Sequence, residues 1–202
     1  MFNVDLLIYV VHTAFWASFG VTHVIVNRRD RDRSAGAVHA GPATDETFEA
    51  PGARALVAFH ALAFAALYLG LGNTVVPGRV PIWFPGQRVA GALIIAAGAA
   101  LMSWSLVYFQ SWRFQAKLDA GHQLATGGPF RFVRHPIYMG LNLFALGTAV
   151  WVPHPIVWAG FVLMCVGSDL RARAEEKLLT RAFGEAYRTY CARTARFVPG
   201  VY

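Results

Sequence analysis

Long apolar runs dominate this sequence and restrict the folds open to it. Three of them, residues 4–26, 53–76 and 89–109, are 21 to 24 residues long. A helix rises about 1.5 Å per residue, so about 20 apolar residues cross a hydrocarbon core about 30 Å thick. Because 56% of the residues are hydrophobic and only 14% are charged, the composition is typical of membrane proteins. We therefore expect an all-α integral membrane protein.

Two shorter apolar runs follow, over residues 137–152 and 156–167, separated by Pro153-His154-Pro155. Each is shorter than a comfortable span. The second is expected to continue without a break into the tail, so that the charged residues from Asp169 onward emerge at the membrane surface. Together with the three longer runs, these two predict about five transmembrane helices.

The tail, residues 169–193, has the pattern of an amphipathic helix. Its apolar side chains recur every three or four positions, at Leu170, Ala174, Leu178, Leu179, Ala182, Phe183, Ala186, Tyr187 and Tyr190. The other face is charged, so we expect the helix to lie against the membrane surface or to cover a neighbouring loop. Gly184 is expected to kink it.

The positions of the basic residues predict the orientation in the membrane. With five spans, residues 27–52, 110–136 and 169–202 fall on one side, and they hold fifteen of the eighteen Lys and Arg. An excess of basic residues marks cytoplasmic loops. The amino terminus is therefore expected outside and the carboxyl terminus in the cytoplasm, in the cell membrane if the source is prokaryotic.

Neither nucleic acid nor a metal ion is an expected partner. The net charge of +7 is explained by the cytoplasmic loops, and no aromatic and basic surface motif accompanies it. Cys165 lies in an apolar run and Cys191 in the basic tail, without the spacing of zinc ligands. Their different depths make a disulfide unexpected and fit a reducing compartment.

A polar stretch, residues 127–140, interrupts the membrane pattern. Its two prolines and three glycines predict a shaped loop that ends by starting a helix near Ile137. On their own, Gly127-Gly128-Pro129 would be a connector, and Arg134-His135 would meet lipid head groups. A helix amino terminus also favours anionic ligand groups, however, and His135 and Tyr138 can face one pocket.

Arg171 and Glu175 are four residues apart on the tail helix and so share a face. The default interpretation is a surface salt bridge. Charges at the point where a span leaves the membrane are also often functional, which keeps a role in chemistry open. His12, His23 and His60 lie inside apolar spans, where helix-to-helix packing or hydrogen bonding is the first interpretation and a substrate path the alternative.

The second half of the chain resembles a known family. The motif residues, in order, are Gly128-Pro129-Phe130, Arg134-His135-Pro136-Ile137-Tyr138-Met139-Gly140, Arg171, Glu175-Glu176, Leu178, Phe183-Gly184, Tyr187, Tyr190 and Arg196-Phe197-Val198-Pro199. They resemble the isoprenylcysteine carboxyl methyltransferase family of integral membrane enzymes and the related phospholipid methyltransferases. About the last 90 residues carry the resemblance.

The resemblance implies a cofactor, S-adenosyl-L-methionine, bound at the cytoplasmic face without a Rossmann domain. By position, the implied cofactor-binding residues are Gln123, Leu124, Gly128, Phe130, Arg134, His135 and Tyr138. Glu176 and Tyr187 are implied to help close the site. Arg171 and Glu175 are implied to work at the reacting end as catalytic residues. Phe130 departs from the family pattern, since many relatives have tyrosine there.

The expected function is methyl transfer from S-adenosylmethionine to a lipophilic small-molecule or lipidated acceptor among membrane lipids. Arg171 would fix an acceptor carboxylate and Glu175 would orient Arg171, whereas Glu175 would act as the base for an amine or thiol. The alternatives are a phospholipid or small amine or thiol methyltransferase, a sterol-reductase-like NADPH enzyme and a non-catalytic membrane protein.

The predicted organisation is one integrated domain with two regions. Residues 1–110 form a three-span membrane region with a loop over 27–52. Residues 111–202 form the methyltransferase core, which contains a cofactor loop at 121–140, a helical hairpin at 137–168 and the tail helix at 169–193.

Overall fold

The structure is a computed structural model that describes residues 4–34, 48–49, 52–109, 117–118 and 124–200. Its α-helices are five long ones, α1 (Leu7–Ser34), α2 (Ala53–Thr74), α3 (Gln87–Phe109), α4 (Pro136–Trp151) and α5 (Pro155–Phe183), and the shorter α6 (Glu185–Arg193). Single turns of 3-10 helix cover Val4–Leu6 (η1) and Gly128–Arg131 (η2). Strands β1 (Phe48–Glu49) and β2 (Lys117–Leu118) pair antiparallel. The expected all-α membrane fold is confirmed.

Within the described ranges, four helices are long and apolar enough to cross a membrane. They are Leu7–Val26, Arg54–Thr74, Gln87–Tyr108 and Pro155–Phe183. The remaining apolar helix, α4, has 16 residues and is shorter than these spans. Five crossings therefore stay a prediction, with α4 as the fifth.

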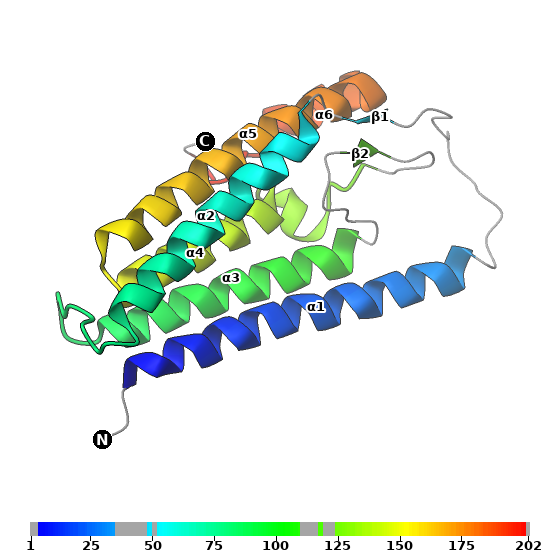
Figure 1. Ribbon diagram of the computed structural model, residues 1–202. Coiled ribbons are helices and arrows are strands. Elements are labelled where there is room, and N and C mark those ends of the chain that lie inside the picture. The colour runs from blue at the N-terminus through cyan, green and yellow to red at the C-terminus, as the bar shows by residue number, and fades with distance from the viewer. Residues whose placement is uncertain (1–3, 35–47, 50–51, 110–116, 119–123, 201–202) are drawn as a thin grey trace.

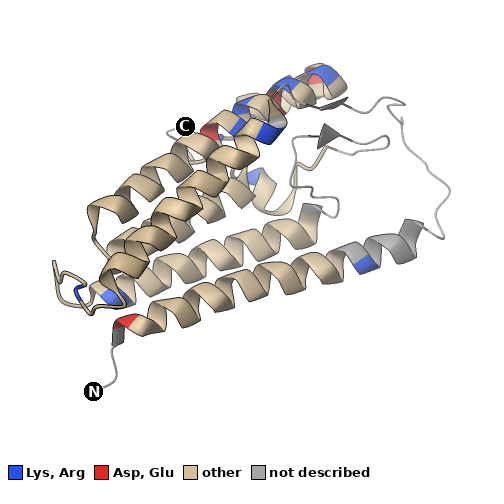
Figure 2. Cartoon of the chain, in the orientation of Figure 1, with Lys and Arg blue, Asp and Glu red and all other residues tan. Residues whose placement is uncertain are grey.

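The helices run up and down in a bundle, with α3 alongside α4 and α2 alongside α5 (Figure 1). The amino-terminal helix α1 lies along the outer side of α3 (Figure 1). Charged side chains gather at the two ends of this bundle and leave its middle bare (Figure 2). One end holds the charged half of α5, and the other holds the ion pair of Asp5 with Arg88.

Paired glycines bring α3 and α4 into backbone contact. A Cβ atom on Gly98 would lie 2.7 Å from the carbonyl oxygen of Gly140, and one on Gly91 would lie 2.7 Å from that of Gly147. Such distances leave no room for a side chain, so only glycine permits this approach. Gly91 and Gly98 of α3 therefore fix α4, and with it the loop before α4, against α3.

The tail continues the last span, as expected. Helix α5 runs unbroken for 29 residues from Pro155 to Phe183. Gly184 then adopts φ +53° and ψ −121°, a conformation that side chains disfavour, and α6 begins at the next residue. The expected kink is thus a break, and it turns α6 away from the axis of α5.

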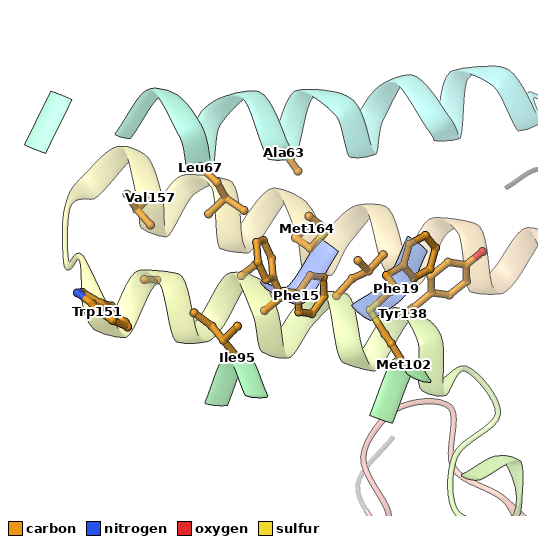
Figure 3. Packing of buried hydrophobic residues seen from close by; sticks show 14 of the residues in the cluster. Phe15, Phe19, Ala63, Leu67, Ile95, Met102, Tyr138, Trp151, Val157 and Met164 are labelled. Carbon is orange, nitrogen blue, oxygen red and sulfur yellow. The ribbon is translucent and has the colours of Figure 1, made fainter. Parts of the chain in front are cut away.

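Aromatic and aliphatic side chains from all five long helices fill the centre of the bundle. Phe15 and Phe19 of α1 lie among Met102, Tyr138 and Met164 of α3, α4 and α5 (Figure 3). The core therefore reaches the end of α4 where the polar loop begins.

A continuous line of hydrogen bonds crosses this core. Thr148 donates its proton to the Phe144 carbonyl at 2.8 Å, so Nε2–H of His12 donates to the Thr148 hydroxyl at 3.0 Å. Nδ1 of His12 then accepts from the Tyr68 hydroxyl at 3.3 Å, which itself accepts from Trp16 at 3.0 Å. Every donor in the chain has an acceptor, so His12 ties α1, α2 and α4 together, as its first interpretation predicted.

Candidate cofactor and reaction site

The end of the described chain pairs with the loop before α4. The Arg134 amide donates to the Ala195 carbonyl at 2.8 Å, and the His135 amide donates to the Arg196 carbonyl at 3.2 Å. Val133 and Ala195 form a parallel bridge. This pairing places Arg196 beside Arg134 and His135, although more than 60 residues separate them in the sequence.

Glu176 lies at the centre of the charged groups brought together in this way. Its Oε1 atom is 3.0 Å from Nε of Arg134 and 3.0 Å from Nε of Arg196. Its Oε2 atom is 2.7 Å from Nη2 of Arg196, and Nε2 of His135 is 3.3 Å from Oε1. Two guanidinium groups and an imidazole thus satisfy one carboxylate, which suits Glu176 to hold its neighbours in place and not to remove a proton.

Arg196 extends the network to Asp169. Its Nη1 atom is 3.1 Å from Oδ1 of Asp169, and Asp169 also pairs with Arg173 at 2.6 Å. Neither Arg196 nor Asp169 was among the expected site residues. Arg196 was visible in the sequence only as part of the terminal motif, to which the resemblance gave no role.

Tyr138 occupies the membrane side of this cluster. Its hydroxyl donates to Oε1 of Glu175, and the guanidinium carbon of Arg171 lies 5.1 Å from its ring centre. The His135 ring stacks on it with centroids 5.8 Å apart, so the two side chains lie in contact. Tyr138 and Arg171 are 3% and 5% exposed, which makes this the water-excluded part of the site.

His135 bridges the two glutamates. Its Nδ1 atom is 3.6 Å from Oε2 of Glu175, and its Nε2 atom faces Glu176. Burial alone lowers the pKa of the imidazole, but the hydrogen bonds to both carboxylates outweigh burial and raise the pKa above its ordinary value. The protonated form is therefore favoured, and it adds a positive charge between the two acidic side chains.

Helix α6 holds the polar loop from outside the membrane. The Tyr190 hydroxyl donates to the Phe130 carbonyl at 2.6 Å. Tyr187 is 1% exposed, and burial followed by the nearby Glu176 carboxylate raises the pKa of its hydroxyl. Among the described residues, no nitrogen or oxygen atom hydrogen-bonds this hydroxyl, and its hydrogen-bonding neighbour is the Cys191 side chain.

Gly128 lies against α3 and not in the charged cluster. It has φ +55°, and a Cβ atom there would lie 2.6 Å from Cδ2 of Tyr108, so a side chain would be both strained and obstructed. Leu124 is half-buried in the segment before this turn, and Gln123 lies outside the described residues. The structure thus gathers Arg134, His135, Tyr138, Arg171, Glu175 and Glu176 in one cluster, with Phe130 and Tyr187 at its edge.

An open groove of about 500 Å³ leads to Glu176 from the surface. Its other lining residues are Arg173, Lys177, Thr180 and Arg181. The groove is mostly basic, so it favours an anionic group at its mouth. Among the described residues, no group of three His, Cys, Asp or Glu side chains is placed to hold a metal ion.

Comparison with known proteins agrees with the resemblance seen in the sequence. The sequence model of the phospholipid methyltransferase family matches residues 87–186. Protein-S-isoprenylcysteine O-methyltransferase B of Arabidopsis thaliana is 35% identical over 130 residues, which are 59% of this chain and 66% of that protein. Enzyme A of the same plant is 29% identical over 117 residues, 57% of this chain and 55% of that protein. The Homo sapiens enzyme is 35% identical over 80 residues, 39% and 28% of the two chains.

A bundle of apolar helices with charged residues gathered at its ends is the architecture of an integral membrane protein. The matches show its kind, since the chain belongs to the isoprenylcysteine carboxyl methyltransferase family within the isoprenylcysteine and phospholipid methyltransferases. The chain spans about half the length of enzyme A of Arabidopsis thaliana.

Proposed function

We propose that this protein transfers a methyl group from S-adenosylmethionine to a lipophilic carboxylate acceptor at the cytoplasmic face of the membrane. The observation that carries the proposal is one largely buried cluster in which Arg171, Tyr138 and Glu175 lie next to Glu176, Arg134 and His135. This cluster lies at the end of the apolar helices where charged residues gather (Figure 2). A soluble charged cofactor and an apolar acceptor can reach the same place only at such a boundary.

The residues present fit a zwitterionic cofactor. Cations and carboxylates alternate around Glu176, and the basic groove opens beside it. The residues proposed to hold the cofactor are Gln123, Leu124, Gly128, Phe130, Arg134, His135, Tyr138, Glu176 and Tyr187. When bound, S-adenosylmethionine supplies a methyl group activated by its sulfonium.

Arg171 is proposed to bind the acceptor. A guanidinium presents two parallel donors that match the two oxygens of a carboxylate. Arg171 is 5% exposed and lies over the Tyr138 ring, so the carboxylate would leave water as it binds. Displacement at a methyl group depends on alignment and on excluding water, both of which a rigid buried guanidinium provides. Glu175, which accepts a hydrogen bond from the Tyr138 hydroxyl, is proposed to orient Arg171.

Transfer to an amine or thiol is the second candidate, since the matched family model describes phospholipid methyltransferases. In that case Glu175 would accept the proton of the reacting atom, because it has fewer cationic partners than Glu176. Acceptor panels that contain a prenylated carboxylate, a phospholipid amine and a small thiol separate the two functions.

Thermal unfolding in detergent tests the cofactor. Ligand binding to the native state raises the unfolding temperature by mass action. We expect S-adenosylhomocysteine at millimolar concentration to raise it and NADPH to leave it unchanged. A shift with NADPH alone would support a reductase and overturn the proposal.

A further inference from the structure

One exposed face of α5 changes from apolar to basic along its length. The residues of this face, called here the α5 stripe, are Val162, Val166, Leu170, Arg173, Lys177 and Arg181. On a helix with about 3.6 residues per turn, these positions fall within an arc of about 100°. The apolar members are 42% to 55% exposed, as expected of side chains that face lipid in a membrane helix. The basic members therefore continue the lipid-facing surface beyond its apolar part.

The depth of the basic members matches that of lipid head groups. Counted from Pro155, where α5 begins, Lys177 lies about 33 Å and Arg181 about 39 Å along the helix axis. The hydrocarbon core is about 30 Å thick, and the head groups add about 5 to 8 Å on each side. A helix that begins at one edge of the core thus carries these two cations to the head groups of the opposite leaflet.

The basic members also line a groove. Together with Glu176 and Thr180, they surround the open volume of about 500 Å³ on this face of α5. In an α-helix the Cα–Cβ bonds tilt toward the amino terminus. For Lys177 and Arg181 this direction is toward the apolar part of the stripe, so their side chains lean back to the membrane and not away from it.

The carboxylates beside the groove are already paired with other cations. Asp169 pairs with Arg173 at 2.6 Å and with Arg196 at 3.1 Å. Glu176 pairs with Arg134 at 3.0 Å and with Arg196 at 2.7 Å. Lys177 and Arg181 therefore add net positive charge to the groove, which favours an anion there.

We propose that the α5 stripe binds an anionic membrane lipid, with its phosphate between Lys177 and Arg181 and its acyl chains along Val162, Val166 and Leu170. A soluble anion would use only the basic part of the stripe, whereas a lipid uses the continuous surface. Such a lipid would fix the depth at which α5 leaves the membrane. This surface does not depend on the proposed function, because its residues lie outside the proposed cofactor and acceptor sites.

Short-chain lipids added to the delipidated full chain in detergent test this surface. The probes are dioctanoylphosphatidylglycerol, dioctanoylphosphatidylcholine and inorganic phosphate. Native mass spectrometry measures binding, and the unfolding temperature reports it independently. We expect the phosphatidylglycerol to bind and to raise the unfolding temperature, more at low salt than at high salt. Phosphatidylcholine should bind more weakly because its head group has no net charge, and inorganic phosphate should cause no shift.

A pair of double variants locates the binding. Lys177→Gln combined with Arg181→Gln removes two charges from the α5 stripe. We expect the affinity for phosphatidylglycerol to fall about fivefold for each charge removed, and the affinity for phosphatidylcholine to stay nearly the same. Arg188→Gln combined with Arg193→Gln is the matched control, because it removes two charges from exposed positions of α6, outside the groove.

Three outcomes would overturn the proposal. Equal losses in the two double variants would mean that the lipid responds to net charge alone. A shift with inorganic phosphate as large as that with phosphatidylglycerol would assign the groove to a soluble anion. Loss of the S-adenosylhomocysteine shift in Lys177→Gln with Arg181→Gln would place the cofactor in the groove. If the unaltered chain binds phosphatidylglycerol as expected but not S-adenosylhomocysteine, the proposed function fails and the lipid site stands.

Discussion

Nη2 of Arg196 lies 2.7 Å from Oε2 of Glu176, so the last described segment of the chain closes onto the middle of α5. Both side chains are 15% exposed, which makes this pair better shielded than the surface pairs of the tail. The guanidinium also reaches Asp169, and it therefore links two turns of α5 to the loop before α4.

Replacing Arg196 with Met should lower stability. The substitution removes charge-assisted hydrogen bonds from a largely buried carboxylate, at a cost of about 2 kcal/mol. Thermal unfolding in detergent measures the change. Arg188→Met is the matched control, because Arg188 pairs with Glu185 where the side chains are 67% and 79% exposed and should change stability little. Equal shifts in the two variants would contradict a structural role for Arg196.

Stability should fall as the pH rises through the folded-state pKa of His135. The pKa of His135 is raised in the folded protein, so protonation stabilises the fold fully below the unfolded pKa of about 6.5, and this stabilisation is lost above the folded value. Unfolding temperatures measured across that range should show the decline, and His135→Gln should flatten it. A decline of the same size in His135→Gln would assign the titration to another group.

Arg171→Ala should abolish methyl transfer while binding of S-adenosylhomocysteine survives. Arg171→Lys should recover little activity, because an ammonium lacks the two parallel donors of a guanidinium. His135→Ala should instead weaken cofactor binding itself, since His135 bridges both glutamates. Single-turnover assays and thermal shifts measure the two effects separately. Normal turnover by Arg171→Ala on the true acceptor would disprove its role.

Gly98→Val should separate α3 from α4. The new side chain would meet the Gly140 carbonyl at 2.7 Å, and such overpacking costs about 1 to 3 kcal/mol. Gly72→Ala is the control, since nothing lies within 4 Å of a Cβ atom there. Alanine also favours a helix over glycine by about 1 kcal/mol. We therefore expect the unfolding temperature to fall in the first variant and not in the second.

The spans could be predicted from the sequence because their length and apolarity follow from the thickness of a bilayer. The extent of α1 could not, since it continues to Ser34 through charged residues that are compatible with a helix outside the membrane. Arg171 and Glu175 could be singled out because charges are costly where a span ends, whereas Glu176 was implied by the family resemblance. The spacing of Arg171 and Glu175 gave no sign that Tyr138 contacts both of these residues.

Arg196 illustrates what one sequence withholds. It reaches Glu176 through backbone pairing between segments about 60 residues apart, and no local pattern marks such a pairing.

The pairing of residues 133–135 with 195–197 also sets an order of events during synthesis. The apolar helices can enter the membrane one after another as they leave the ribosome. The carboxylate of Glu176 acquires its Arg196 partner only after residue 196 has emerged. A nascent chain halted before that point would carry its membrane helices but an incomplete charged cluster.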